Sequence, residues 1–439
     1  MGLRIALIHP PVGKPCEPPA GIAKLAACLQ THDISYKVVD ANLEGMLYLL
    51  RNHRNDSISD NWSLQAIRHV EKNIQALRND YIYNDMNRYL RRVLDLNRVL
   101  KVAGKPYGVH LSLADYQDSK CYPVRSGDLI QSAKIPENNP FYPYFKHSLE
   151  LLLKEDPEFV GFSLNYLSQA LCTFAMIGYI KKCNPDQKII LGGSLTTSWV
   201  KICKHKNVFS GLVDHMIAGA GEKSLLRLLQ ANDNIILEQF NYNDFDIERY
   251  LSPKIVLPVS ASIGCYWKKC SFCPEKAEGN KYVTQPVGSI INTINVFNRK
   301  HPSGLIHFLD NAISPAFMNA IINKQFRMPW YGFARITSEL TDPEFCKALK
   351  QSGCVMLKLG VESGDQMVLD KLAKGVSIED ISVALRSLHG AGIATYVYLL
   401  FGTPSETESK ARKTEEFIER HSTYIDFLNI AVFNLPVLS

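Results

Sequence analysis

The chain has 439 residues, of which 46% are apolar and 21% charged, and its formal net charge is +6. This length accommodates two or three domains, and the composition is that of an ordinary globular protein. So mild a positive charge gives no reason to expect a nucleic-acid partner, and no run of 18 apolar residues predicts a membrane span;. The 11 cysteines are scattered and no secretory signal precedes them, which argues against a disulfide framework and predicts a cytoplasmic protein;.

The chain begins with an alternation of strand and helix. Residues 4–9 predict a buried strand, residues 20–30 an amphipathic helix and residues 36–39 a second strand;. A strand–helix–strand order predicts a parallel α/β sheet, and the Pro-rich loop after the first strand lies where such sheets bind ligands. A rigid connection is the alternative interpretation of that loop.

Residues 46–150 interrupt this alternation. Apolar residues at helical spacing predict one helix over 62–77 and another over 84–102;. Residues 106–144 carry five prolines and several aromatic residues, which favours an extended segment;. We therefore expect a helical insertion into the first domain.

The alternation resumes with strands predicted at 159–164, 188–191 and 213–218, and glycine-rich turns follow the last two. Glycines at strand ends let a ligand approach the backbone, and the next helix offers free N–H groups at its N-terminus. One such turn is more often only a tight turn, whereas two in successive units of one sheet favour a ligand site. Residues 233–252 are polar and acidic, and are expected to form a linker.

Three cysteines fall within nine residues of the second half: Cys265, Cys270 and Cys273. Thiolates at this density favour an iron–sulfur cluster or zinc. A structural zinc site needs a fourth ligand at short spacing, and the next cysteine and histidine in the chain are Cys346 and His301;. Three thiolates would leave one iron of a [4Fe–4S] cluster open to a small molecule.

From this loop onward, strands and helices alternate regularly. Six strands are predicted, and a helical segment precedes each strand after the first; the strands are 255–260, 305–309, 331–335, 355–361, 395–401 and 425–432;. Repeated strand–helix units of this kind predict a partial (β/α)6 barrel, whose chemistry is expected at the carboxyl ends of the strands.

The second half resembles the radical S-adenosylmethionine (SAM) enzymes over about 253–433. Their usual C-x3-C-x2-C spacing is one residue shorter than the C-x4-C-x2-C found here. Residues 359–364 look like the family's Gly-x-Glu segment, whose carboxylate hydrogen-bonds the ribose of SAM, and residues 401–407 look like its Gly-x-Pro-x-Glu-Thr segment. The resemblance implies cluster ligation by the three cysteines and SAM contacts from Phe272, Asp310, Arg335, Glu362 and Gly402. A structural ion pair between Asp310 and Arg335 is the alternative for those two.

The first half resembles the cobalamin-binding domain attached to many radical SAM enzymes, over about 1–45 and 155–232. The likeness rests on Pro18-Pro19-Ala20-Gly21 and on the two glycine-rich turns. The contacts it implies for cobalamin come from Pro19, Gly21, Gly192, Gly193, Ser194, Gly219, Gly221 and Glu222. None of the 12 histidines has an aspartate two residues before it, so the cobalt-ligating Asp-x-His-x-x-Gly motif is not expected. A scaffold without a cofactor is the alternative.

Together these features predict an α/β chain of three parts. Residues 1–232 would form a doubly wound parallel-sheet domain with the helical insertion at about 46–150, residues 233–252 a linker, and residues 253–439 a radical SAM partial barrel. The resemblance implies reductive cleavage of SAM to a 5′-deoxyadenosyl radical for C–H activation, with cobalamin-dependent methylation or modification of a peptide or natural product as the specific form. It also implies a small-molecule or peptide substrate and an electron donor such as a flavodoxin or ferredoxin.

The end of the chain leaves a second class of function open. The sequence stops directly after the sixth predicted strand, where relatives usually continue with a segment that contacts substrate. A shortened, non-catalytic iron–sulfur binding or electron-transfer protein is therefore the alternative.

Overall fold

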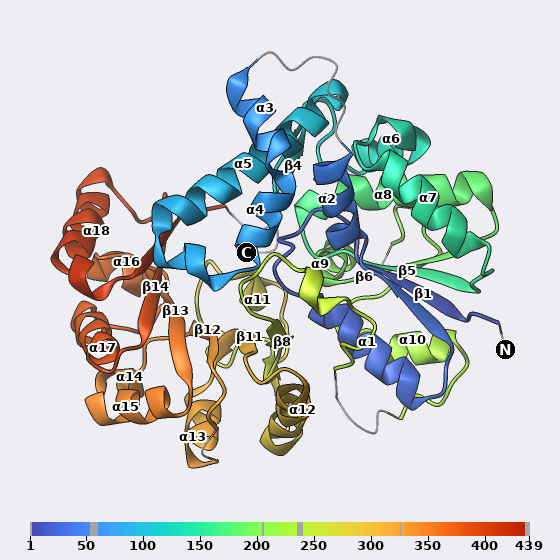
Figure 1. Cartoon of the computed structure of the whole chain (residues 1–439). Coiled ribbons are helices and arrows are strands. Elements are labelled where there is room, and N and C mark those ends of the chain that lie inside the picture. Colours follow the sequence, from blue (N-terminus) through green and yellow to red (C-terminus); the bar gives the residue numbers. More distant parts are fainter. Residues whose placement is uncertain (1, 53–59, 204–205, 235–239, 325, 435–439) are drawn as a thin grey trace. The chain divides into compact units, whose positions relative to one another are not determined.

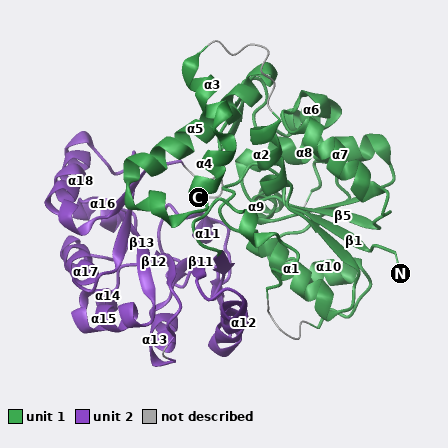
Figure 2. Ribbon diagram, in the orientation of Figure 1, with its two compact units in different colours: residues 1–255 green, residues 256–439 purple. Residues whose placement is uncertain are grey.

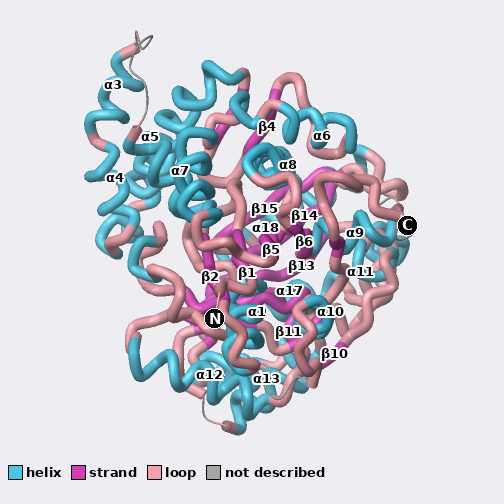
Figure 3. The backbone as a smooth tube through the Cα atoms, turned by 90° about the vertical axis from the view of Figure 1, so that its right-hand side faces the viewer, coloured by secondary structure: helices cyan, strands magenta, loops and turns pink. Residues whose placement is uncertain are grey.

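The computed structural model describes residues 2–52, 60–203, 206–234, 240–324 and 326–434 (Figure 1). The chain divides into two compact units, residues 1–255 and residues 256–439 (Figure 2). Each unit contains one parallel sheet with helices packed against it, and Figure 3 draws the strands in magenta and the helices in cyan. None of the described helices is both long and apolar enough to cross a bilayer.

The sheet of the first unit has the strand order β2-β1-β5-β6-β7, and all of its pairings are parallel. Its strands are β1 (Ile5–Ile8), β2 (Tyr36–Val39), β5 (Phe159–Ser163), β6 (Lys188–Gly192) and β7 (His215–Met216). This is a doubly wound order, so the predicted fold class is confirmed. The last strand is shorter than predicted, because only two of the residues 213–218 pair with β6.

Helices cover both faces of this sheet. On one face α1 (Ala20–Thr31) packs against α10 (Glu222–Leu228), and on the other α8 (Leu167–Cys183) packs against α9 (Ser194–Ile202) through the rings of Phe174 and Trp199 (Figure 1). Twelve residues of α8 are buried, because the insertion covers the side of this helix that faces away from the sheet. A helix that is apolar all round belongs in the interior of a domain.

The insertion is helical, but two of its predicted segments were wrong. Residues 62–77 form two helices divided at His69, and residues 106–144 contain a hairpin and a helix instead of an extended chain. The prolines were interpreted as a sign of extended chain, but Pro106, Pro136 and Pro143 lie in first turns of helices, where proline is tolerated;. The elements are α2 (Ala41–Arg51), α3 (Asn61–Arg68), α4 (Val70–Leu77), η1 (Asp80–Asn84), α5 (Met86–Gly104), η2 (Lys105–Tyr107), β3 (Val109–Leu111), β4 (Tyr116–Asp118), α6 (Ser126–Lys134), η3 (Pro136–Asn138) and α7 (Tyr142–Leu153).

The described part of the segment expected to be a linker packs against the first unit. The Asn241 amide donates to the Ala23 carbonyl, the Leu251 amide donates to the Pro15 carbonyl, and a short 3-10 turn, η4 (Ile247–Arg249), lies between them. Tyr250 and Leu251 belong to the hydrophobic core of this unit.

The second unit is built on a six-stranded parallel sheet with the order β15-β14-β13-β12-β11-β8. Its strands are β8 (Val256–Val259), β11 (Leu305–Ile313), β12 (Trp330–Ala334), β13 (Cys354–Glu362), β14 (Ala394–Phe401) and β15 (Phe427–Val432). Each new strand is added beside the previous one, which is the order of a (β/α) barrel. The predicted partial six-stranded barrel is confirmed.

The helices of this unit lie along one face of the sheet (Figure 1). Strand residues such as Phe308, Leu357 and Val397 are fully buried. Residues at the alternate positions are only half-buried. The helices are α12 (Val287–Lys300), α13 (Pro315–Asn323), α14 (Ser338–Thr341), α15 (Pro343–Gln351), α16 (Gln366–Lys371), α17 (Ile378–Gly390) and α18 (Glu408–Arg420), with a 3-10 turn, η5 (Ser422–Tyr424), before β15.

Candidate functional site

The cysteine loop leaves the sheet after β8. A short hairpin, β9 (Ser262–Ile263) with β10 (Val283–Thr284), frames the loop, and α11 (Pro274–Ala277) follows it. Cys265, Cys270 and Cys273 are half-buried free thiols. Burial raises the pKa of Cys270 and of Cys273, and for Cys273 the backbone N–H groups at the start of α11 oppose that rise.

The donor set of this loop, three half-buried thiols close together in sequence, fits an iron–sulfur cluster;. A zinc ion needs its ligands at one point, whereas in a cluster each thiolate binds an iron of its own.

The loop rests on the turn that joins α16 to α17, residues 371–375. The Ser271 amide donates to the Leu372 carbonyl at 2.9 Å, and the Ser271 hydroxyl donates to the Lys371 carbonyl at 3.2 Å. The Trp267 indole N–H donates to the Ala373 carbonyl at 3.2 Å. Trp267 lies between the first two cysteines, so the spacing that is one residue longer than usual holds a side chain that fastens the loop.

Arg335 follows β12 and brings a positive charge to the thiols. Its Nη1 atom lies 3.9 Å from the Cys270 sulfur, and its Nη2 atom donates to the Lys374 carbonyl at 2.6 Å. The guanidinium carbon lies 4.0 Å from the centre of the Trp267 ring, a cation–π contact;. Only 7% of Arg335 is exposed, so its charge acts on Cys270 with little screening by water;.

A buried ion pair lies beside these groups. Lys374 Nζ is 2.7 Å from Glu362 Oε1, and the two side chains are 7% and 12% exposed. A Cβ atom at position 360 would come within 2.5 Å of Glu362 Oε1 and 2.7 Å of Lys374 Nζ, so the glycine of the Gly-x-Glu segment provides the space in which the pair meets. Glu362 has a φ of 68°, which is uncommon for a residue other than glycine;. The ammonium of Lys374 also lies 5.9 Å from the centre of the Phe272 ring.

Asp310, in the second half of β11, holds the start of the loop. Its carboxylate accepts hydrogen bonds from the Ala261 amide at 2.9 Å and the Ser262 hydroxyl at 2.5 Å. Burial raises the pKa of Asp310, and these two donors oppose the rise. Asp310 and Arg335 have different partners, and the ion pairs among the described residues do not join them.

Gly402 lies where β14 ends, and its amide donates to Glu406 Oε2 at 2.5 Å. The other oxygen of Glu406 and the hydroxyl of Thr403 are buried without a hydrogen-bond partner. Buried polar atoms without partners mark this turn as a place for a further polar contact.

Arg335 contacts the cysteine loop directly, and Lys374 links Glu362 to the ring of Phe272 in that loop. Asp310 binds the start of the loop, and Gly402 is held by its own turn. The sequence reasoning missed Trp267 and Lys374. Trp267 could have been found, because the extra residue of the loop pointed to that segment. Lys374 belongs to no recognisable pattern.

In the first unit, the candidate residues lie at the carboxyl ends of the strands and at the helices that follow. Pro19 precedes α1, Gly21 lies in its first turn, and Gly193 precedes α9. The Ser194 amide donates to Asn165 Oδ1 at 3.1 Å, so this N–H group already has a partner.

In the glycine-rich turn after β7, Gly219 faces open space, whereas Glu222 is already paired. The Gly219 amide donates to Thr197 Oγ1 at 2.9 Å, and the Cα positions of Gly192 and Gly219 face open space. Gly221 precedes α10, and Glu222 is buried in an ion pair with Lys24 at 2.8 Å. Glu222 thus ties α10 to α1, an arrangement that accounts for its burial without a ligand.

Two side chains at this edge were not anticipated. Tyr166, just after β5, is 60% exposed, and His9, at the end of β1, is 8% exposed with a buried Nδ1 atom that has no partner. Burial lowers the pKa of His9 and keeps the imidazole neutral.

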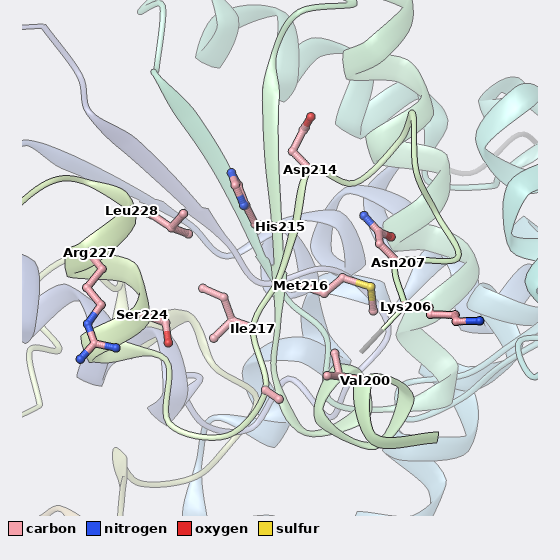
Figure 4. A pocket seen from close by; sticks show the side chains of 11 residues that line it. Val200, Lys206, Asn207, Asp214, His215, Met216, Ile217, Ser224, Arg227 and Leu228 are labelled. Atoms are coloured by element: carbon pink, nitrogen blue, oxygen red, sulfur yellow. The ribbon is translucent and has the colours of Figure 1, made fainter. Parts of the chain in front are cut away.

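A pocket of about 490 Å³ lies beside the edge strand β7 (Figure 4). Two of its charged side chains already have partners, since Asp214 binds Lys181 and the Ile189 amide, and Arg227 binds Asp233. We therefore place the candidate site of this unit at the strand ends instead of in this pocket. The lining residues are Val200, Lys206, Asn207, Asp214, His215, Met216, Ile217, Ala218, Ser224, Arg227 and Leu228.

The second unit matches a known protein family. Residues 259–418 match the family model described as the Radical SAM superfamily. The anaerobic magnesium-protoporphyrin IX monomethyl ester cyclase of Rubrivivax gelatinosus is 22% identical over an alignment of 278 positions, which covers 53% of this chain and 49% of the cyclase. The chain thus spans about half the length of this relative.

Solved structures resemble the whole chain in fold. TsrM of Kitasatospora setae, a radical SAM methyltransferase with cobalamin and a [4Fe–4S] cluster bound, superposes with a TM-score of 0.62 at 14% identity, covering 98% of this chain and 75% of TsrM. The cobalamin-dependent radical SAM enzyme OxsB, with aqua-cobalamin bound, gives a TM-score of 0.57 at 13% identity, covering 95% of this chain and 52% of OxsB. At this identity the two likenesses establish the fold.

Proposed function

We propose that this chain, whose residues 259–418 form a domain of the radical SAM superfamily, is a radical SAM enzyme that activates a C–H bond of a small-molecule or peptide substrate. A cobalamin-dependent methylation is the specific reaction we favour. The observation that carries the proposal is the cysteine loop, with its three free thiols held against the turn at 371–375 beside Arg335 and the Glu362–Lys374 pair.

Each residue of this site would have a definite task. Cys265, Cys270 and Cys273 would bind three irons of a [4Fe–4S] cluster and leave the fourth to SAM. When bound, the cluster supplies the electron that cleaves SAM to methionine and a 5′-deoxyadenosyl radical. Arg335 would stabilise the negative charge of the Cys270 thiolate, and Glu362 would accept a hydrogen bond from a hydroxyl of SAM;. The ring of Phe272 would pack against the adenine of SAM, and the Gly402 turn would present polar groups to SAM. Asp310 would hold the start of the cysteine loop. A flavodoxin or ferredoxin would provide the electron.

For the first unit we propose a corrinoid at the carboxyl ends of the strands. Support comes from the open space at Gly192 and Gly219, from the exposed ring of Tyr166, and from the likeness to two structures that hold cobalamin. Gly192 and Gly219 would let it approach the backbone, and Gly193 and Ser194 would fix the turn beside it. Pro19, Gly21 and Gly221 would shape its rim, and Glu222 would act indirectly, by joining α10 to α1.

Anaerobic reconstitution tests the enzyme proposal. The protein is loaded with iron and sulfide, reduced, and incubated with SAM, and 5′-deoxyadenosine is measured by chromatography. We expect close to four irons per chain and formation of 5′-deoxyadenosine. Cys265→Ala, Cys270→Ala and Cys273→Ala should abolish both, while Cys183→Ala, which removes an exposed thiol of the first unit, should change neither.

A fully loaded, reducible cluster without 5′-deoxyadenosine would contradict the enzyme proposal and leave an iron–sulfur binding or electron-transfer protein. For the corrinoid, the protein is incubated with hydroxocobalamin and passed through a desalting column. Retained corrinoid absorbance supports the proposal, and its loss with Gly192→Phe, a substitution into open space, would place the corrinoid at the strand ends.

A further inference from the structure

The inner face of the six-stranded sheet, opposite its helices, carries aromatic rings where a barrel core would carry aliphatic side chains. In β13, Leu357 and Leu359 point toward the helices and are fully buried, whereas Lys358 between them is half-buried on the inner face. The parallel register places rings beside it on the neighbouring strands: Tyr331, Phe333, Tyr396, Tyr398 and Phe427, together with the imidazole of His307.

These rings form a continuous row around Lys358. His307 stacks on Tyr331 with ring centres 4.3 Å apart and planes within 7°. The Lys358 ammonium lies 3.1 Å from His307 Nε2, 4.9 Å from the Tyr331 ring centre and 5.1 Å from that of Phe333.

The row continues across the next two strands. The ring of Phe333 lies 4.9 Å from that of Tyr398, which lies 4.9 Å from Tyr396, and Tyr396 lies 5.7 Å from Phe427. Burial raises the pKa of Tyr398 to about 12, so its hydroxyl remains a hydrogen-bond donor. The row therefore combines flat apolar faces with hydroxyl donors and one fixed cation.

This composition is unsuited to a closed core. The interiors of complete barrels are filled by Val, Ile and Leu, and burying an ammonium or an imidazole in a packed interior is costly. Aromatic faces with a few fixed polar groups are instead typical of sites for small molecules. The inner strand positions carry one lysine, Lys358, and one carboxylate, Glu362, which is already paired with Lys374. The Lys358 ammonium has three N–H donors, so it can keep its contact with His307 and still donate to an anionic group of a ligand;.

We infer that this inner face is the substrate-binding surface of the second unit, that it selects a planar aromatic substrate bearing a carboxylate or another anionic group, and that Lys358 determines this selectivity. The inference rests on the proposed function, because it names the class of substrate for that site. The rings would stack against the planar part of the substrate, and Lys358 would bind its anionic group by a charge-assisted hydrogen bond.

Three matched probes test this inference on the cluster-loaded protein by isothermal titration calorimetry. Indole-3-acetate is aromatic and anionic, indole-3-acetamide is aromatic and neutral, and cyclohexylacetate is anionic with a saturated ring instead of an aromatic one. We expect indole-3-acetate to bind the wild type at least about tenfold more tightly than either other probe, because each of those lacks one of the two interactions.

Variants then assign the selectivity to Lys358. Lys358→Met should weaken indole-3-acetate about tenfold and leave indole-3-acetamide within about threefold, while Lys358→Arg should retain part of the preference for the acid. Lys347→Met, on the exposed side of α15, is the control and should bind all three probes as the wild type does.

Several results would overturn the inference: binding of none of the probes by the wild type, equal affinity for the acid and the amide, or equal losses in Lys358→Met and Lys347→Met. The 5′-deoxyadenosine assay is separate. A protein that forms 5′-deoxyadenosine without probe selectivity loses this inference alone, and one that selects the acid without forming 5′-deoxyadenosine loses the proposed function alone.

Discussion

In each unit the parallel strands end at one edge of the sheet of that unit. These two edges are built from different groups. In the second unit, charged and aromatic side chains hold one another, since Arg335 binds the Lys374 carbonyl and contacts Cys270 and Trp267, and Lys374 binds Glu362. In the first unit the edge consists mainly of backbone and glycine.

This difference bears on what each edge can recognise. Convergent side-chain charges act on particular atoms of a ligand, so the second unit has groups that can stabilise charge during a reaction. Open backbone accommodates a large ligand through many weak contacts. The buried carboxylates of the first edge are occupied, since Glu222 pairs with Lys24, and Asp40 accepts from the Leu43 amide and the Tyr250 hydroxyl. Substitutions at the first edge should therefore act by changing the backbone conformation. Substitutions at the second edge should act by removing charged contacts.

The largest effect is expected at Gly193. This residue has a φ of 104°, and a Cβ atom there would come within 2.3 Å of the Leu164 carbonyl oxygen. Gly193→Ala combines backbone strain with a steric clash, and should lower the free energy of unfolding of the first unit by about 4 kcal/mol. Urea unfolding followed by circular dichroism measures the change.

The neighbouring glycine is the matched control. A Cβ atom at position 192 meets nothing within 4 Å, so Gly192→Ala should change the free energy of unfolding by less than about 0.5 kcal/mol;. Equal losses in the two variants would show that this edge does not depend on the backbone geometry of Gly193.

In the second unit the largest effect should come from Lys374. Lys374→Met leaves Glu362 buried without its partner and should lower the free energy of unfolding by about 3 kcal/mol;. Lys347→Met breaks a surface pair whose side chains are 58% and 78% exposed, and should leave the unfolding transition where it is in the wild type;. The double variant Lys374→Met/Glu362→Gln should recover most of the lost stability, and failure to recover would show that Lys374 acts through something other than Glu362.

The fold could largely be predicted because regular alternation survives in the sequence. Six strands of the second unit follow from apolar runs separated by helical periodicity. The prediction failed over 106–144, where prolines that begin helical turns were interpreted as breakers of structure. The composition of such a segment does not distinguish these two uses of proline.

Of the candidate site, the sequence revealed the thiols and the strand-end positions, because both are patterns of spacing. It did not reveal that residues 371–375 support the cysteine loop, since about a hundred residues separate the two segments and only folding brings them together. Lys374 and Trp267 gain their importance from these tertiary contacts, which no local pattern encodes.

A smaller effect is expected at Trp267. Trp267→Phe keeps a ring beneath Arg335 but removes the N–H that binds the Ala373 carbonyl, a loss of about 1 kcal/mol of loop anchoring;. The loop should open more often, and the cluster should lose iron to a chelator about fivefold faster. Trp62→Phe, which alters an indole of the first unit, should leave this rate unchanged, and equal rates in all three proteins would show that Trp267 does not anchor the loop.

The smallest effect should be a pH dependence at Asp310. Because burial raises its pKa above the ordinary 3.8, the folded protein binds this proton more tightly than the unfolded chain does. The contribution of Asp310 to stability is therefore present at acidic pH and is lost as the pH rises through the raised pKa. The free energy of unfolding of the wild type minus that of Asp310→Asn should fall as the pH rises from about 4 and then become constant.

Ser262→Ala sharpens this measurement. It removes a hydroxyl that donates to the carboxylate and opposes the effect of burial, so the pKa of Asp310 should rise further and the fall should extend to higher pH;. The opposite result, a difference that grows with pH, would mean that the donors at Ala261 and Ser262 outweigh burial and that Asp310 holds the cysteine loop chiefly as a carboxylate. In that case the brace beneath the thiols would weaken in acid, and the cluster should lose iron faster there than at neutral pH.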